Sequence, residues 1–138
     1  MAKARTVPHS PPADHPNLAA VCRDLDQWPR SWMGFPEDIP PGEQIVAAFR
    51  SFLVHLVGLQ LSRKTLRKHV DNLWLLGGEL IRDVNTTPAL RKRPIAALLF
   101  AAIEEGGPLL YHGGSEAEQR SFDATCRTLR RFLEQQPH

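Results

Sequence analysis

Residues 62–84 read SRKTLRKHVDNLWLLGGELIRDV, and their apolar side chains recur every three or four positions. This period is typical of one face of an α-helix. Ser62 suits the N-cap, because its hydroxyl can accept hydrogen bonds from the free amides of the first turn. Gly77 and Gly78 each disfavour the helix by about 1 kcal/mol relative to alanine, so either a neighbouring helix crosses closely there or the helix bends. The apolar face consists of Leu66, Val70, Leu73, Leu80, Ile81 and Val84.

Two helices are expected before this segment. Residues 17–28 carry apolar side chains at helical spacing, and Pro29 ends the pattern. Residues 29–41 combine prolines with large apolar side chains and predict an ordered covering loop. Pro41 suits the first position of the next helix, over residues 41–58, because a missing N–H is not needed there.

Two further helices are expected after it. Residues 94–105 are apolar on nearly every face, which predicts the central buried helix of the fold. Residues 88–92 lie between two breaks and form a short turn at most. Ser115 and Glu118 make a capping box at the start of a last helix, over residues 115–136.

These patterns predict an all-α protein, folded as a compact bundle of four to five helices in one domain over residues 17–136. No segment shows convincing strand alternation. The chain has 138 residues, of which 42% are hydrophobic and 23% charged, and this composition fits a single globular domain. Residues 1–16 are rich in proline and predict a disordered tail.

Composition and cysteine usage bear on the compartment. The longest wholly apolar run, residues 95–103, is far shorter than the roughly 20 residues of a membrane-spanning helix. The N-terminal residues lack the apolar stretch of a secretory signal. Cys22 and Cys126 are far apart and suit a reducing compartment, where both stay thiols. We expect a bacterial-type cytoplasmic protein with no membrane partner.

Basic residues concentrate in residues 62–93. This part carries eight Lys and Arg against three Asp and Glu, a charge of +5, although the whole chain carries only +2. Four of the cations crowd the first two turns of the helix after Ser62, where the positive end of the helix dipole disfavours each by about 0.3–1 kcal/mol. A bound phosphate chain would relieve this conflict, whereas a solvated basic face needs no ligand. The candidate nucleic-acid-binding cations are Arg63, Lys64, Arg67, Lys68, Arg91, Lys92 and Arg93.

Residues 48–56, AFRSFLVHL, are aromatic-rich, and residues 58–73, GLQLSRKTLRKHVDNL, follow with a Leu-Ser-x-x-Thr turn into a basic helix. Over residues 45–84 the chain resembles the N-terminal core-binding domain of tyrosine recombinases and phage integrases, a small helical domain that clamps duplex DNA. The resemblance implies that the cations after Ser62 contact the DNA backbone. It also implies two phosphate hydrogen-bond donors, Ser62 and Thr65.

Recombinase chemistry needs a second domain with a tyrosine nucleophile and a cluster of arginine and histidine. The sole tyrosine, Tyr111, lies in a glycine-flanked loop and follows no such cluster. No acid–base pair and no nucleophile with its base can be assembled from the spacing of other residues. We therefore expect no catalytic residues, no cofactor and no small-molecule substrate, with DNA as the leading partner.

Cysteine and histidine residues do not occur at the short spacings of structural zinc sites, so no metal site is expected. On apolar helix faces, Cys22 and Cys126 are typical of small buried hydrophobes. His69 is expected to pack and His55 to be exposed. The loop over residues 106–114 favours a structural helix connection, although its glycines would also permit an anion cradle.

The aromatic residues before the second helix support an alternative function. They either seal the bundle or form an exposed surface for a partner. In the second case, the chain is a protein–protein interaction or assembly module, which binds a protein or itself through residues 28–35 or through the apolar helix faces. The partner-binding residues of this alternative are Trp28, Trp32 and Phe35.

Overall fold

The structure is a computed structural model, and it describes residues 17–110 and 114–136. Helices and no strands are found in these residues, which confirms the predicted all-α class. The expected disordered tail, residues 1–16, lies outside the described residues. The elements are α1 (Leu18–Val21), η1 (Leu25–Gln27), α2 (Trp28–Trp32), η2 (Pro36–Asp38), α3 (Ile39–Gly58), α4 (Arg63–Thr86), η3 (Pro88–Lys92), α5 (Ile95–Ala102) and α6 (Glu116–Glu134), where η denotes a 3-10 helix.

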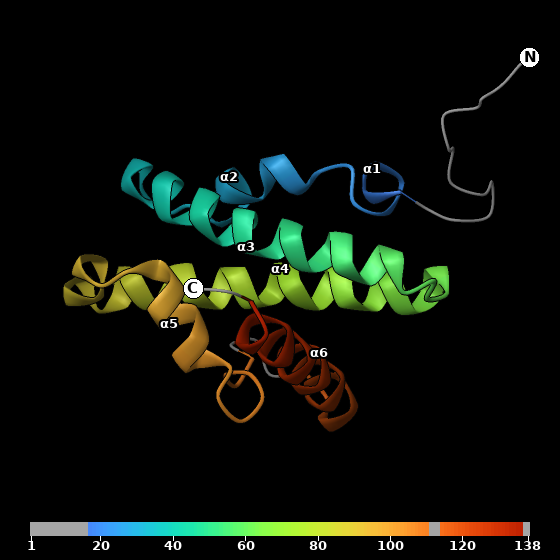
Figure 1. The fold of residues 1–138 in the computed structure, drawn as a ribbon. Coiled ribbons are helices and arrows are strands. Elements are labelled where there is room, and N and C mark those ends of the chain that lie inside the picture. Colours follow the sequence, from blue (N-terminus) through green and yellow to red (C-terminus); the bar gives the residue numbers. More distant parts are fainter. Residues whose placement is uncertain (1–16, 111–113, 137–138) are drawn as a thin grey trace, which may run out of the picture.

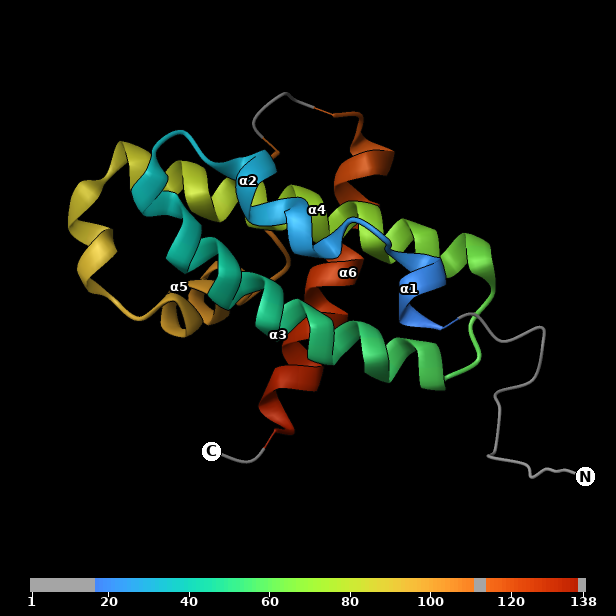
Figure 2. The same cartoon turned by 90° about the horizontal axis from the view of Figure 1, so that it is seen from above.

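The longest helix, α4, lies in the middle of the molecule, with α1, α2 and α3 on one side and α5 and α6 on the other (Figure 1). α3 runs antiparallel beside α4, and α6 crosses the pair at a steep angle (Figure 2). The apolar faces of these three helices meet in one core. Its fully buried side chains include Phe49, Phe52, Leu53, Leu66, Leu73, Leu76, Phe122, Cys126 and Leu129.

The predicted N-terminal caps of α4 and α6 are present. Ser62 Oγ accepts the amide of Thr65 at 3.1 Å at the start of α4. Ser115 Oγ accepts the amide of Glu118 at 3.1 Å, and the Glu118 carboxylate accepts the amide of Ser115 at 2.8 Å at the start of α6. These side chains satisfy amides that have no acceptor within the helix.

The glycine pair of α4 is explained by a close contact, since α4 is one continuous helix. The six-membered ring of Trp32 lies on Gly77, where a methyl group would overlap it. The Trp32 indole also donates a hydrogen bond from Nε1 to the carbonyl of Trp74 at 3.0 Å. The glycine therefore lets α2 approach the backbone of α4.

The prediction for residues 17–41 is wrong in two respects. The expected single helix over residues 17–28 is divided into α1, η1 and the start of α2, because Cys22 leaves the helical conformation with φ of −146° and ψ of 84°. The expected loop is mostly helical, and Pro29 lies inside the first turn of α2. Since the amides of a first turn need no intrahelical acceptor, proline starts this helix instead of ending the previous one. For the same reason α3 begins at Ile39, before Pro41.

The expectation of a central buried helix over residues 94–105 is also wrong. α5 ends at Ala102 and lies at the edge of the molecule, with Ile95 and Leu99 buried. Its alanines at positions 96, 97 and 101 are exposed, and this is tolerated because a methyl group has little apolar surface. The central place belongs to α4, which contacts five of the other helices and η3. The remaining predicted bounds, 62–84 and 115–136, differ from α4 and α6 by two residues or fewer at each end.

Candidate nucleic-acid interface

The first two turns of α4 present four cations to solvent, and we call this group the α4 opening: Arg63, Lys64, Arg67 and Lys68. All four residues are exposed. Among the described residues, Arg67 has an ion pair with Asp71 at 4.0 Å, and none is found for the other three. An exposed pair at this distance stabilises by less than about 1 kcal/mol. The α4 opening therefore remains strongly positive.

The two hydroxyls that the family resemblance assigns to phosphate are already engaged with each other. Ser62 Oγ donates to Thr65 Oγ1 at 3.0 Å while it accepts the Thr65 amide. Because the hydroxyl hydrogen of Ser62 is engaged in this way, we assign Ser62 to the helix cap. The Thr65 hydroxyl keeps its own hydrogen for a further acceptor.

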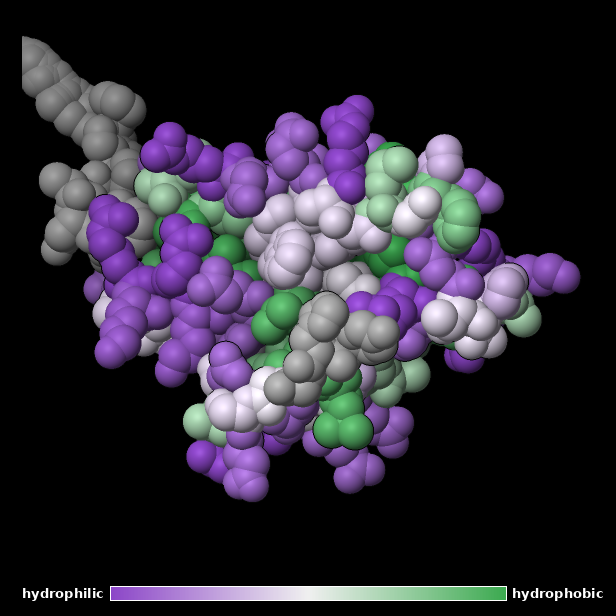
Figure 3. Space-filling model, turned by 180° about the vertical axis from the view of Figure 1, so that it is seen from behind, coloured by the Kyte–Doolittle hydropathy of each residue, from purple (hydrophilic) through white to green (hydrophobic). Residues whose placement is uncertain are grey.

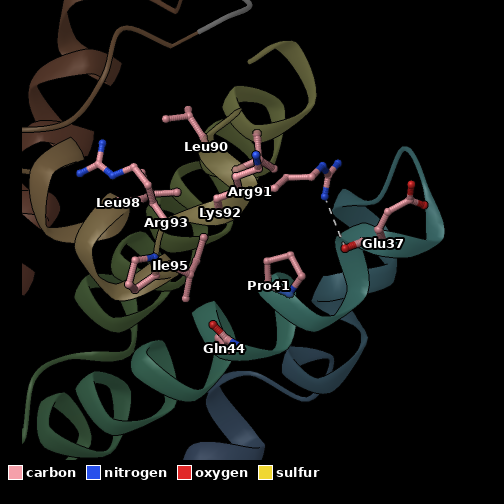
Figure 4. Close-up of a pocket in the computed structure, with 11 residues that line it drawn as sticks. Glu37, Pro41, Gln44, Leu90, Arg91, Lys92, Arg93, Ile95 and Leu98 are labelled. Atoms are coloured by element: carbon pink, nitrogen blue, oxygen red, sulfur yellow. Dashed lines mark hydrogen bonds between the residues drawn. The ribbon is translucent and has the colours of Figure 1, made fainter. Parts of the chain in front are cut away.

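The second basic group consists of Arg91, Lys92 and Arg93 and lies beyond the far end of α4. Its members have different surroundings. α4 has 24 residues, so the two groups are separated by about 36 Å of helix. Lys92 and Arg93 are exposed. Arg91 instead turns inward: Nη2 donates to Asp38 Oδ1 at 2.6 Å, and Nη1 to the carbonyl of Glu37 at 3.4 Å (Figure 4). Arg91 is thus a structural residue, and the prediction that it contacts nucleic acid is not supported.

The carboxylate that holds Arg91 is completely buried. Asp38 Oδ2 accepts the amides of Gly34 at 2.7 Å and Phe35 at 3.0 Å, and the side-chain amide of Asn85 at 3.2 Å. Burial acts to raise the pKa of Asp38, but the hydrogen bonds from Arg91 and these amides outweigh burial and hold the pKa below its ordinary value. This cluster joins η2, the end of α4 and η3.

A groove of about 520 Å³ lies beside this cluster, between α3, η3 and α5. Pro41, Leu90, Ile95 and Leu98 line it together with the basic residues 91–93 (Figure 4). The cations of this groove lie beyond the end of α4, so the length of that helix separates them from the α4 opening.

The aromatic residues of the alternative function mostly seal the bundle. Trp28 and Trp32 are 2% and 9% exposed, and each packs edge-on against Phe49. Phe35 is 53% exposed. Two of the three proposed partner-binding residues are therefore covered by the fold, and Phe35 is the exposed one.

An exposed tryptophan that the sequence analysis did not single out lies on the outer face of α4. Trp74 is 41% exposed, and its neighbour Leu75 is 36% exposed. Sequence spacing indicates that Trp74 lies on the same helix face as two of the cations, because it follows Arg67 by seven residues and Arg63 by eleven. These steps are two and three turns of an α-helix, so all three side chains share one face.

The cysteines are buried thiols. Burial is the main cause that raises the pKa of Cys22 to about 11 and that of Cys126 to about 12. Neither side chain is therefore a thiolate at neutral pH. Within residues 17–110 and 114–136, no three His, Cys, Asp or Glu side chains are placed to hold a metal ion.

His69 packs, as expected, and links α4 to α6. Its Nδ1 lies 2.9 Å from the hydroxyl of Thr125, which also accepts a hydrogen bond from Asn72 Nδ2 at 2.9 Å. Burial and the neighbouring charge of Lys68 lower the pKa of His69. His55 is exposed on α3, as expected, with its ring 5.0 Å from that of Phe132.

The described part of the loop over residues 106–114 supports the structural interpretation. The amide of Gly107 donates to Asp123 at 3.0 Å, and that of Leu110 donates to the side chain of Gln119 at 3.1 Å. These amides already have acceptors on α6, so they do not form an anion cradle. Tyr111 lies outside the described residues.

Among the helices of residues 17–110 and 114–136, none combines the length and the apolar composition that a membrane-spanning segment requires. Comparisons of this chain with protein-family models, with curated proteins and with solved structures find no match.

Proposed function

We propose that this protein binds the phosphate backbone of a polynucleotide through the α4 opening and acts as a binding module without catalysis. One observation carries the proposal. In the described part of the chain, Arg63, Lys64 and Lys68 extend into solvent without a carboxylate partner, and the charges of Arg63 and Lys64 lie in the first turn of α4, where the helix dipole makes them unfavourable. Phosphate oxygens would neutralise these side chains and would interact favourably with the same end of the helix dipole.

The resemblance to the recombinase core-binding domain supports the same assignment. Residues 45–84, which carry it, form most of the α3–α4 antiparallel pair (Figure 2). Contacts restricted to phosphates supply affinity and orientation but no base sequence preference. We propose DNA as the first polynucleotide to test, in a bacterial-type cytoplasmic protein.

A matched pair of double variants tests the location of the interface. Arg63→Ala/Lys64→Ala and Lys92→Ala/Arg93→Ala each remove one arginine and one lysine from exposed positions, at opposite ends of α4. Affinity for a fluorescent oligonucleotide is measured by anisotropy. We expect the first variant to lose at least about tenfold in affinity, since two of four phosphate contacts disappear, and the second to change much less. Equal losses would point to diffuse charge attraction and overturn the proposal.

Salt dependence provides a second readout. With four phosphate contacts, affinity should fall about 50- to 150-fold between 50 and 200 mM salt. The Arg63→Ala/Lys64→Ala variant should show about half the logarithmic slope. The absence of binding at low salt, or binding that is insensitive to salt, would also overturn the proposal.

A further inference from the structure

The outer face of α4 continues from the α4 opening to an exposed tryptophan. Arg63, Arg67 and Trp74 form one row, and Lys64, Lys68 and Leu75 form the adjacent row, because steps of four, seven and eleven residues return to the same side of a helix. The distance from the first cation to Trp74 along the axis is about 16 Å. In Figure 3, which shows this side of the molecule, strongly hydrophilic side chains gather at the end where α4 begins and paler ones occupy the middle.

The Trp74 ring is held in place although it is exposed. Its Nε1 donates to Ser31 Oγ at 2.9 Å, and Ser31 Oγ donates in turn to the carbonyl of Trp28 at 2.7 Å. The indole is thus tied to α2 by its edge, while 41% of the residue faces solvent. An aromatic ring fixed in this way offers a stacking surface without a further loss of side-chain freedom.

A groove of about 340 Å³ lies beside the ring, and we call it the Trp74 groove. It has an apolar part, a cation and two carboxylates. These lining residues are Trp28, Val70, Trp74 and Leu75, then Arg67, then Asp24 and Asp71.

The chemistry of the Trp74 groove differs from that of the α4 opening. The carboxylates of Asp24 and Asp71 repel a phosphate group, but they can accept hydrogen bonds from the amino and ring N–H groups of a nucleobase. The indole and the apolar lining suit the flat face of the same base. Phosphates therefore fit the cations, and a base fits the groove.

A base in a duplex cannot occupy such a site, because its faces are covered by neighbouring bases and its pairing edge is engaged. From this juxtaposition we propose that the protein binds single-stranded nucleic acid, with phosphates on the α4 opening and one unpaired base stacked on Trp74 in the Trp74 groove. This inference rests on the proposed function and names its substrate class.

The test compares four ligands of about 12 nucleotides, within the range of single-strand site sizes: single-stranded DNA, single-stranded RNA, duplex DNA and an abasic DNA strand. The abasic strand keeps the phosphates and lacks the bases. We expect DNA or RNA single strands to bind at least about fivefold more tightly than the abasic strand, since stacking of one base gives roughly 5- to 150-fold. Comparison of the affinities for single-stranded DNA and single-stranded RNA shows which of the two the protein prefers.

Trp74→Ala should remove this advantage and leave the affinities for the duplex and the abasic strand unchanged. Val54→Ala is the control, because Val54 is an exposed apolar residue of α3, at 56%, that does not line the Trp74 groove. Trp74→Phe should restore part of the affinity. Single strands should also quench tryptophan fluorescence in the wild type, since Trp28 and Trp32 are buried and Trp74 is the accessible tryptophan of the described residues.

The outcomes separate the inference from the proposed function. If single strands bind no better than the abasic strand, or if Trp74→Ala weakens all ligands equally, the inference fails while backbone binding stands. If no ligand binds, the proposed function fails. Should Trp74→Ala not fold, the abasic comparison with the wild-type protein still decides.

Discussion

Arg63 and Arg91 stand near opposite ends of the same helix. At the α4 opening, the guanidinium of Arg63 is exposed and has no ion pair with a described carboxylate. Beyond the far end, the guanidinium of Arg91 reaches a completely buried carboxylate, that of Asp38, at 2.6 Å. Each residue is next to a lysine in the chain, and both belong to the same basic region of residues 62–93.

The difference shows that the charge of neighbouring residues does not determine the role of a cation. Asp38 is 53 residues before Arg91 in the sequence, and the fold brings the two together through η2 and η3. No carboxylate is brought to Arg63 in the described residues. The exposed cations are therefore available for an external anion, while the paired cation stabilises the junction of η2, α4 and η3.

The largest effect is expected from Arg91→Ala. The variant leaves the buried Asp38 carboxylate without its cation, which is expected to lower the free energy of unfolding by about 3 kcal/mol. We choose the lower end of the usual range because the Arg91 side chain is itself 27% exposed. Arg93→Ala, at an exposed position two residues away, should change stability by less than about 0.5 kcal/mol. Urea unfolding measures both.

Equal destabilisation by Arg91→Ala and Arg93→Ala would show that the ion pair of Arg91 does not distinguish this end of α4 from the α4 opening. A double-mutant cycle with Asp38→Ala provides the control. Since removal of both partners leaves no unpaired charge, the double variant should be less destabilised than the sum of the single variants.

A smaller effect is expected at the middle of α4, where two adjacent glycines have different surroundings. In Gly77→Ala the new methyl group overlaps the Trp32 ring, and overpacking of this kind destabilises by about 1–3 kcal/mol. In Gly78→Ala the nearest Trp32 atom is 3.5 Å away, an ordinary contact. The second variant should therefore stabilise by about 0.5–1 kcal/mol through helix propensity.

Thermal unfolding of the two alanine variants measures the sign of each change. Stabilisation by both substitutions would show that Trp32 can move aside, and that α2 is not fixed on α4 by this contact.

The sequence was informative wherever local chemistry decides the structure. Ser62 and Ser115 satisfy amides of their own helices, so their caps could be predicted from neighbouring residues. The spacing of the apolar residues likewise predicted α4 and α6. The spacing of Trp74 from Arg63 and Arg67 likewise predicts that the three side chains share one face of α4.

Other features depend on contacts that are distant in the chain. Two such contacts are the ion pair of Arg91 with Asp38 and the packing of the Trp32 ring on Gly77. Both depend on how the α2–η2 segment packs against α4. The apolar composition of α5 predicted deep burial, but its alanines are too small to require it. Residues 29–41 appeared irregular because of their prolines, although proline is compatible with the first turn of each helix that follows.

Acid titration provides a second test of the ion pair between Asp38 and Arg91. Because the folded-state pKa of Asp38 lies below the ordinary value of 3.8, its contribution to stability is present above that pH and is lost as pH falls through the folded-state pKa. Wild-type stability should decline below about pH 4. Asp38→Asn cannot ionise and should show a weaker decline, whereas Arg63→Ala/Lys64→Ala should retain the wild-type decline. Urea unfolding at a series of pH values measures the slopes.

The smallest effect on stability is expected from neutralisation of the α4 opening itself. Exposed cations near a helix N-terminus are disfavoured by about 0.3–1 kcal/mol each, and the described residues provide no ion pair that would be lost with Arg63 or Lys64. Arg63→Ala/Lys64→Ala should therefore leave the melting temperature unchanged or raise it slightly, since alanine also favours the helix. A clear loss of stability would mean that these cations have a structural role like that of Arg91. Unchanged stability, together with weaker oligonucleotide binding, is the combination expected of residues that interact with an external anion.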